Sequence, residues 1–268
     1  LTSITIPEGI TSIGDRAFLQ CSSLESITIP DSVISIGESA FQSCSSLTSV
    51  TIPDSVISIE DWTFWQCSSL TSVTIPDGVT SIGFSAFAEC ASLASVTIPG
   101  SVTTLGRSAF YGCSSLTSIV IPDSVTSTGA YVLAGCVNLT EVTLGSGITS
   151  LEDSFFHGCS SLTSITIPDS VTSIGTEAFR NCTALVSITF LGSAPTVDAD
   201  AFTGVAAGAV AIVSGVEQAT FGDVGADWNG LAVACNDGVL CWLTWTTTDG
   251  EVTITDCNEA TPGELVIP

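Results

Sequence analysis

A repeat of 23 residues constrains the fold of this chain more than any other feature of its sequence. The segment LTSVTIPDSVISIEDWTFWQCSS at 47–69 is followed, without a gap, by LTSVTIPDGVTSIGFSAFAECAS at 70–92. Repeats of fixed length between about 20 and 50 residues are typical of solenoids, propellers and arrays, in which each repeat is one structural unit. The fold therefore has to follow from the repeat rather than from any single motif.

Three residue types recur at this period and fix the register. They are cysteine from Cys21 to Cys182, phenylalanine from Phe18 to Phe202 with Leu133 in the one gap, and leucine from Leu1 to Leu185. Nine units result, with no insertion or deletion between them. The simplest explanation is a solenoid in which each unit is one coil and equivalent residues stack above one another.

Each unit contains two short extended segments and a turn. In the first unit Ile4 and Ile6 alternate with Ser3 and Thr5, which is the period of a strand with one buried face. Proline ends that strand, P-D-S-V or P-D-G-V turns the chain, and V-T-S-I-G runs back with Val and Ile inward. We expect A-F-x-x-C to form a single helical turn that carries Ala, Phe and Cys into the core. The stacked strands would form a parallel sheet with a spacing of about 4.8 Å.

The unit L-x-x-I-x-I-P-x-x-V-x-x-I-G-x-x-A-F-x-x-C resembles the BspA-like leucine-rich repeat, also called the Treponema-type repeat, over residues 1 to about 205. The departures are local: Glu60 and Glu152 replace the glycine, Thr128 replaces the inward isoleucine, and Val205 replaces the last cysteine. The resemblance implies a leucine-rich-repeat solenoid that is secreted or exposed on the cell surface. It also implies adhesion and protein interaction rather than catalysis.

The pattern divides the chain into three parts. We expect the solenoid over 1–185, the last repeat and a C-terminal cap over 186–237, and a β-hairpin followed by the start of a further array or a linker over 238–268. Asp249-Gly250 between two alternating segments is a strong signal for the hairpin turn. Leu1 enters in mid-register without a cap, so we expect either upstream sequence or a neighbour that covers this end. Head-to-tail assembly into a filament is the corresponding hypothesis.

Charge limits the classes of partner. The chain has 3 basic residues, all arginine, against 27 acidic ones, and its net charge is -24. This balance argues against binding to nucleic acid and to anionic membrane surfaces, and it permits cations or basic partners. No apolar run reaches the roughly 18 residues that a membrane helix needs, so we expect no membrane insertion.

The cysteines of the repeat follow the inward phenylalanine and lack the C-x-x-C spacing of metal sites. We therefore interpret them as small, buried core residues with free thiols. Cys235, Cys241 and Cys257 lie outside the repeats. In an exported protein, Cys235 with Cys241 is the pair for which we expect a disulfide.

An acidic residue recurs in the turn after the proline, with Asp31, Asp54 and Asp77 in successive units. Stacked carboxylates could bind Ca²⁺, but a turn residue that bonds nearby backbone is the interpretation we favour, because one carboxylate per coil makes a poor cage. No cofactor is expected. Like charges in such a column repel each other, and salt screens that repulsion.

Two surfaces are candidates for binding. The outward positions of the first strand form a Ser/Thr grid, represented by Ser49, Thr51, Ser72 and Thr74, which could bind glycan, mineral or ice or could be ordinary solvent-facing residues. Trp62 and Trp65 replace small or polar residues of the repeat, and exposed aromatic side chains are good contact anchors. Packing variation in the core explains them equally well, and Tyr111 and Tyr131 are weaker candidates of the same kind.

The sequence thus favours a non-catalytic extracellular or cell-surface adhesion module that binds a protein or glycan on another cell or in the matrix. One alternative is a structural subunit that assembles head-to-tail into a surface filament or sheath. A second alternative is ice or crystal binding through the Ser/Thr grid. An enzyme is not expected, because identical coils repeat their polar groups and an active site needs asymmetry.

Overall fold

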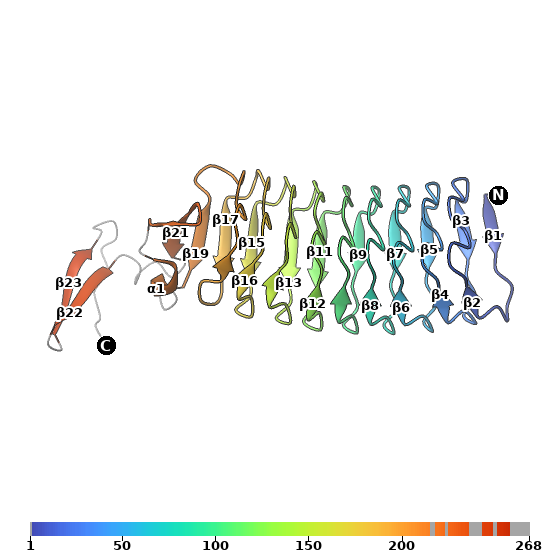
Figure 1. Ribbon diagram of the computed structural model, residues 1–268, viewed down its shortest axis with the longest axis horizontal. Helices are drawn as coiled ribbons and strands as arrows, with labels where there is room; N and C mark the ends of the chain where they lie inside the picture. Colours follow the sequence, from blue (N-terminus) through green and yellow to red (C-terminus); the bar gives the residue numbers. More distant parts are fainter. Residues whose placement is uncertain (1, 215–217, 223–224, 236–242, 249–250, 258–268) are drawn as a thin grey trace.

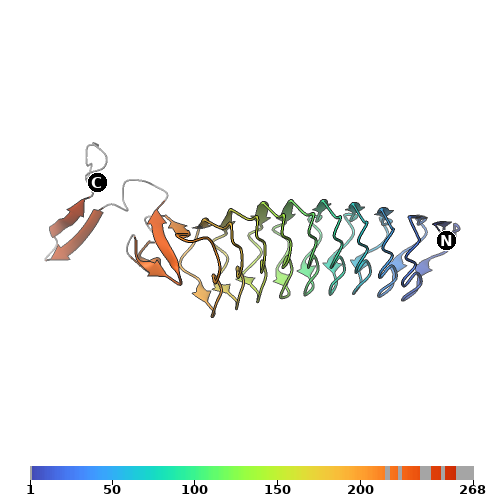
Figure 2. The same ribbon diagram turned by 90° about the horizontal axis from the view of Figure 1, so that it is seen from above.

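The computed structural model describes residues 2–214, 218–222, 225–235, 243–248 and 251–257. The repeats wind into a rod in which each coil lies directly above the one before it, with the N-terminus at one end (Figure 1). The same stack seen from above shows the coils side by side at a regular spacing (Figure 2). The predicted leucine-rich-repeat solenoid is confirmed.

The first strand of each coil is the alternating segment after the leading leucine. These strands are β1 (Ser3–Thr5), β3 (Ser26–Thr28), β5 (Ser49–Thr51), β7 (Ser72–Thr74), β9 (Ser95–Thr97), β11 (Ser118–Ile121), β13 (Glu141–Leu144), β15 (Ser164–Ile167) and β17 (Ser187–Phe190). Their pairing is parallel and joins residues one full repeat apart, as in Ser49 with Ser72 and Thr51 with Thr74. The hydrogen-bonded groups are β1-β3-β5-β7-β9, β11-β13 and, from β15 onward, a group that continues into the C-terminal cap.

The second strand of each coil is shorter and follows the proline turn. These strands are β2 (Ser12–Ile13), β4 (Ser35–Ile36), β6 (Ser58–Ile59), β8 (Ser81–Ile82), β10 (Thr104–Leu105), β12 (Ser127–Thr128), β14 (Ser150–Leu151), β16 (Ser173–Ile174) and β18 (Thr196–Val197). In the second coil the amide of Val33 donates to the carbonyl of Pro30 at 3.0 Å, which closes the turn. The proline lacks an amide hydrogen, but its carbonyl remains available for this bond.

The A-F-x-x-C segment differs from the prediction, because no helix occurs anywhere within residues 2–214. The amides of Ser39, Phe41 and Ser43 donate to carbonyls of the next coil at 3.0, 2.9 and 2.7 Å, whereas the amides between them donate three residues back within their own coil. Ser39 and Ser43 also have φ values of 55° and 59°, in the left-handed region. A helix needs every amide to bond within its own segment, so the expected helical turn was wrong. Left-handed residues cost roughly 1–2 kcal/mol each, and the hydrogen bonds between coils offset that cost.

The phenylalanines form a file of stacked rings through the core. Phe41 and Phe64 have ring centroids 5.4 Å apart and planes inclined by 1°. The other stacked pairs of the file lie between 5.2 and 5.6 Å. Leu133 interrupts the file, and beside that gap Phe155 replaces the usual small residue and contacts Phe156 at 4.8 Å. The predicted column of equivalent residues is confirmed.

The repeat cysteines lie beside the phenylalanines and bond to the coil before. The thiol of Cys67 donates to the carbonyl oxygen of Phe41 at 3.1 Å, and every repeat cysteine from Cys44 to Cys182 makes the equivalent bond. These thiols are free and buried, as predicted, and Cys21 is partly buried. Burial is the main cause that raises the pKa of the seven thiols from Cys44 to Cys182, to about 12 for Cys90. They are therefore neutral structural donors at physiological pH.

The C-terminal end of the stack is covered by β19 (Val210–Val213), α1 (Gln218–Phe221), β20 (Asp227–Trp228) and β21 (Leu231–Cys235). β19 and β21 continue the parallel sheet from β17, and β20 pairs antiparallel with β21. Trp228 contacts Phe190, Phe202 and Phe221, with ring centroids between 4.8 and 6.0 Å apart. This aromatic cluster seals the last coil, as a stack of repeats requires at its ends.

Beyond the cap, β22 (Leu243–Thr248) pairs antiparallel with β23 (Glu251–Cys257), which confirms the predicted hairpin strands. The predicted turn at Asp249-Gly250 and the expected start of a further array after 257 lie outside the described residues. Cys235 is disulfide-bonded. Cys241 lies outside the described residues, so the Cys235–Cys241 pairing stays a prediction. None of the described helices has the length and hydrophobicity of a membrane span.

Candidate binding surfaces

Five aromatic side chains from neighbouring coils gather in one depression of about 380 Å³, here called the aromatic groove. Its lining comprises Trp62, Trp65, Phe84, Tyr111 and Tyr131 together with Ser85, Ala88, Glu89, Arg107 and Ser108. All ten residues belong to the turn segments that link the second strand of a coil to the next leucine. The structure thus brings the predicted Trp62 and Trp65 together with both tyrosines that the sequence singled out.

The turn segments place these aromatic residues partly in solvent. Trp62 has a φ of 53° and takes the left-handed position that Ser39 takes one coil earlier. Its ring meets Phe84 edge-on, with centroids 4.9 Å apart and planes inclined by 75°. Trp62 and Trp65 are half-buried, and Tyr111 is 41% exposed. Such side chains offer large contact area at low entropic cost, because they are already held by their neighbours.

The groove also contains one of the three arginines of the chain. The guanidinium of Arg107 lies 4.8 Å above the ring centre of Tyr131, which is within the range of a cation–π contact. The other two arginines are paired with acids: Arg16 with Glu38 at 3.4 Å, and Arg180 with Glu177. On a molecule with a net charge of -24, the aromatic groove is therefore unusual: within the part of the chain that the structure describes, its arginine forms no ion pair with a carboxylate.

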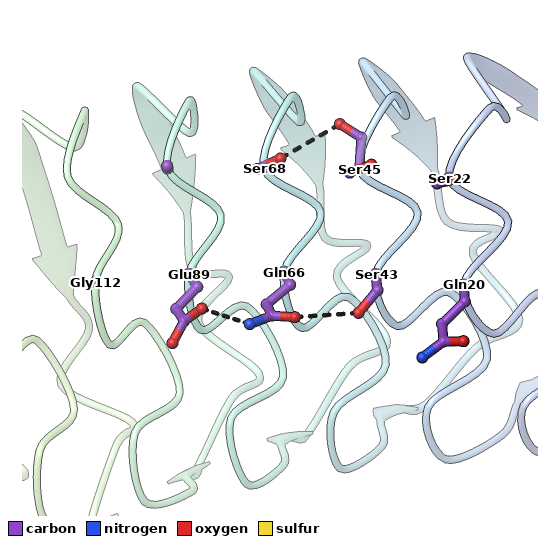
Figure 3. A pocket seen from close by; sticks show the side chains of 9 residues that line it. Gln20, Ser22, Ser43, Ser45, Gln66, Ser68, Glu89 and Gly112 are labelled. Carbon is purple, nitrogen blue, oxygen red and sulfur yellow. Dashed lines mark hydrogen bonds between the residues drawn. The ribbon is translucent and has the colours of Figure 1, made fainter.

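A second depression of about 720 Å³, here called the polar groove, runs along the first five coils (Figure 3). Its lining residues are Gln20, Ser22, Ser43, Ser45, Gln66, Ser68, Glu89, Ala91 and Gly112. Ser43 donates its hydroxyl hydrogen to Oε1 of Gln66 at 3.2 Å, and Nε2 of Gln66 donates to Oε2 of Glu89 at 2.7 Å. Figure 3 shows these side chains following one another from the same turn of successive coils. Glu89 lines both grooves.

The predicted Ser/Thr grid is a separate surface. Ser49 and Thr51 on β5 and Ser72 and Thr74 on β7 are exposed and stand in register on one face of the sheet. None of the four lines either groove. Binding of a ligand, of ice or of a crystal surface by their hydroxyls stays a prediction.

The carboxylates of the acidic column do not come together as a cluster of potential metal ligands in the described residues. Asp31, Asp54 and Asp77 are exposed, and no three His, Cys, Asp or Glu side chains of the described residues come together as metal ligands. The related Asp123 accepts hydrogen bonds from the amide and the hydroxyl of Ser146 in the next coil, at 2.7 and 3.1 Å. At Asp123 the carboxylate thus bonds to the neighbouring coil, and Ca²⁺ binding by the column stays a prediction.

Sequence reasoning missed Phe84, Arg107 and the Gln66–Glu89 ladder. Phe84 and Arg107 occupy the position that Asp15, Glu38 and Asp61 occupy in other coils, so an apolar or basic residue there was a visible departure. Gln20, Ser43, Gln66 and Glu89 form an uninterrupted polar column in the sequence. Comparing every column of the repeat for departures would have found both sets.

Comparisons with known proteins agree with this architecture. The family model for the BspA type leucine rich repeat region, in 6 copies, matches residues 1–117 and 80–207. The crystal structure of a leucine-rich repeat protein from Bacteroides ovatus ATCC 8483 is 30% identical, with a TM-score of 0.63, over 88% of this chain and 66% of that chain. The T. pallidum leucine-rich repeat protein is 27% identical, with a TM-score of 0.54, over 69% of this chain and 78% of its own.

The pneumococcal vaccine antigen PcpA shares the fold at 17% identity and a TM-score of 0.51, over 88% of this chain and 68% of that chain. Comparison with curated proteins gives no match. The chain therefore covers just under two thirds of the Bacteroides ovatus protein and a larger share of the other two. The family match extends over all nine coils, and on this basis the chain belongs to the BspA-type leucine-rich repeat family.

Proposed function

We propose that the protein is a non-catalytic adhesion module that acts outside the cell or at its surface and binds a protein or glycan of another cell or of the matrix. The observation that carries this proposal is the aromatic groove, which concentrates Trp62, Trp65, Tyr111 and Tyr131 on a stack of otherwise small and polar turns. Tryptophan and tyrosine are the residues that most often dominate binding energy at interfaces.

Two further features support the proposal. Cys235 is disulfide-bonded, and such bonds persist in oxidising, extracytoplasmic compartments. The repeat thiols, with pKa values raised by burial, are unsuited to act as nucleophiles, because reactivity belongs to the thiolate. The rigid stack therefore serves best as a scaffold that presents a surface.

Adherence of protein-coated beads to epithelial cells and to immobilised matrix glycoproteins tests the proposal. The decisive variant is Trp62→Ser with Trp65→Gln, because Ser39 and Gln42 occupy these positions one coil earlier. We expect adherence to fall by about tenfold or more, as it does when interface hot spots are removed.

The matched control is Thr51→Ala with Thr74→Ala on the sheet face, which should adhere like the wild type. Loss of adherence in this control, with the tryptophan variant unaffected, would assign binding to the Ser/Thr grid instead. Absence of adherence by the wild type to cells and to matrix proteins alike would contradict the proposed function. Circular dichroism and thermal unfolding of each variant confirm that it folds.

A further inference from the structure

The aromatic groove and the polar groove adjoin, and we infer that together they form one trough that binds a neutral, linear polysaccharide lying along the solenoid axis. This inference rests on the proposed function and assigns the chemical class of its ligand. Glu89 is the residue that joins the two parts, because it lines both depressions. The volumes of about 720 and 380 Å³ lie in the range of sites for small molecules and short chain segments.

The polar groove supplies a hydrogen-bonding side chain from each of the first four coils. Gln20, Ser43, Gln66 and Glu89 occupy equivalent positions, so these groups repeat at the spacing of the stack (Figure 3). The bonds from Ser43 to Gln66 and from Gln66 to Glu89 fix the orientation of the amide and of the carboxylate. Hydrogen-bonding groups that are held in place before binding lose little entropy when a ligand arrives.

The ladder leaves bonding capacity directed at a ligand. Within the described residues, Glu89 uses Oε2 for Gln66, and its Oε1 accepts no hydrogen bond. The Gln66 amide has two hydrogens, of which one is donated to Glu89. Sugar hydroxyls both donate and accept, so one hydroxyl can donate to the carboxylate and a second can accept from the amide. A polymer with hydroxyls on every unit matches a ladder with one polar side chain on each of the first four coils.

The aromatic groove supplies the apolar half of the same recognition. A pyranose ring has a face of C–H bonds, which packs on the negative face of an aromatic ring. The edge-on contact between Trp62 and Phe84 holds the indole in place, and Tyr111 remains 41% exposed for contact. Arg107 occupies one side of Tyr131 and adds donors for hydroxyl oxygens. Aromatic surface beside fixed polar groups is therefore complementary to a sugar and less so to a purely apolar chain.

Charge selects a neutral ligand. The molecule carries a net charge of -24, so an anionic polysaccharide would be repelled on approach. A basic peptide would be attracted to the molecule as a whole, but it would meet the guanidinium of Arg107 inside the aromatic groove. The charged residues that line the trough are Glu89 and Arg107, one of each sign. A neutral glycan meets neither penalty.

Native gels that contain dissolved polysaccharide test the inference on the full chain. The neutral probes are β-glucan, mannan, galactomannan and dextran; alginate is the acidic probe, and an oligolysine peptide is tested separately by tryptophan fluorescence. We expect at least one neutral polysaccharide to retard the wild type. Trp62→Ser with Trp65→Gln should lower the affinity by about tenfold or more.

A second variant tests the polar half of the trough. Glu89→Gly adopts the residue of the equivalent Gly112, suits the φ of 58° at this position, and should weaken binding severalfold. Thr51→Ala with Thr74→Ala should bind like the wild type. If polysaccharide retarded both trough variants as strongly as the wild type, the assignment of the site would be overturned.

The remaining outcomes separate this inference from the proposed function. The glycan assignment would be overturned if no neutral polysaccharide retarded the wild type more strongly than the double tryptophan variant. Binding of alginate alone or of oligolysine alone would do the same. If the tryptophan variant then still lost adherence to cells, the adhesion proposal would stand with a protein as its ligand.

Discussion

The thiol of Cys67 donates a hydrogen bond to the backbone carbonyl of Phe41, in the coil before it, at 3.1 Å. The same oxygen also accepts a hydrogen bond from the amide of Cys44 at 3.1 Å. The thiol therefore bonds to the second lone pair of this buried carbonyl oxygen. A side chain of this position must therefore be small, apolar and able to donate, and cysteine combines these properties. The repeat cysteines act as hydrogen-bonded spacers between coils.

Replacement of Cys67 by alanine should destabilise the stack, because it removes a buried donor and leaves a small cavity. We expect the free energy of unfolding to fall by about 1–3 kcal/mol. Cys21→Ala is the matched control, since Cys21 is only partly buried, and it should cost less. Equal losses for the two variants in denaturant titrations would show that the bond between coils contributes nothing.

Alkaline pH should unfold the protein over the range in which the thiols of the unfolded chain ionise. Burial raises the pKa of Cys90 from the usual 9.0 to about 12, and that of Cys44, Cys136 and Cys182 likewise. The unfolded chain loses these protons above pH 9 while the folded chain keeps them until about 12. Stability is therefore complete below pH 9 and decreases as the pH rises toward 12, by roughly 1 kcal/mol per thiol per pH unit.

Denaturant titrations from neutral to alkaline pH measure this loss. The variant Cys90→Ala should show a shallower decrease than the wild type, because it lacks one of the ionising groups. A disulfide reagent at neutral pH gives an independent measurement: Cys21 should react first, and the buried repeat thiols only upon unfolding. Rapid reaction of all eight repeat thiols in the folded protein would contradict the buried ladder.

Gly106 should not tolerate a side chain. A Cβ atom there would lie 2.5 Å from the carbonyl carbon of Gly83 and 2.6 Å from the amide nitrogen of Phe84, both backbone atoms of the coil below. Gly106→Ala should therefore lower the free energy of unfolding by about 1–3 kcal/mol or more. Gly100→Ala is the control, because a Cβ at Gly100 meets no atom within 4 Å. Thermal unfolding in which both variants behave alike would mean that the coils are not in backbone contact at this position.

Salt should stabilise the protein. Asp31, Asp54 and Asp77 repeat along one edge of a molecule with a net charge of -24, and added ions screen repulsion between exposed charges. We expect the unfolding temperature to rise with sodium chloride. Calcium chloride at matched ionic strength separates screening from a specific site: an additional rise with calcium would indicate binding. A melting temperature independent of salt would contradict the repulsion.

The sequence predicted the stack well because its period is strict. Phe41, Phe64 and Phe87 lie in one file, as residues separated by a full repeat must when no insertion shifts the register. The expected helical turn at A-F-x-x-C was wrong because this segment forms hydrogen bonds to the next coil, which the sequence of a single unit does not reveal. The amide of Phe41 bonds to Thr63 of the next coil, so the preferred conformation depends on a neighbour 22 residues away.

The candidate site was only partly predictable. Trp62 and Trp65 were identified because they depart from the repeat, and Tyr111 and Tyr131 for the same reason. Their convergence with Arg107 depends on which turn positions of coils 3 to 6 face the same depression, which the period alone does not determine. The orientation of Gln66 between Ser43 and Glu89 likewise follows from the spacing of coils in three dimensions.

Hydroxyl-radical footprinting of the protein while it adheres to its target tests the location of the binding site most directly. Trp62, Trp65 and Tyr111 report the aromatic groove, Val120, which is 58% exposed, reports the sheet face, and Ile57, which is 65% exposed, reports the second-strand side. We predict that oxidation of the groove residues falls on binding while oxidation of Val120 and Ile57 does not change. Protection of Val120 with the tryptophans still oxidised would contradict the assignment of binding to the aromatic groove.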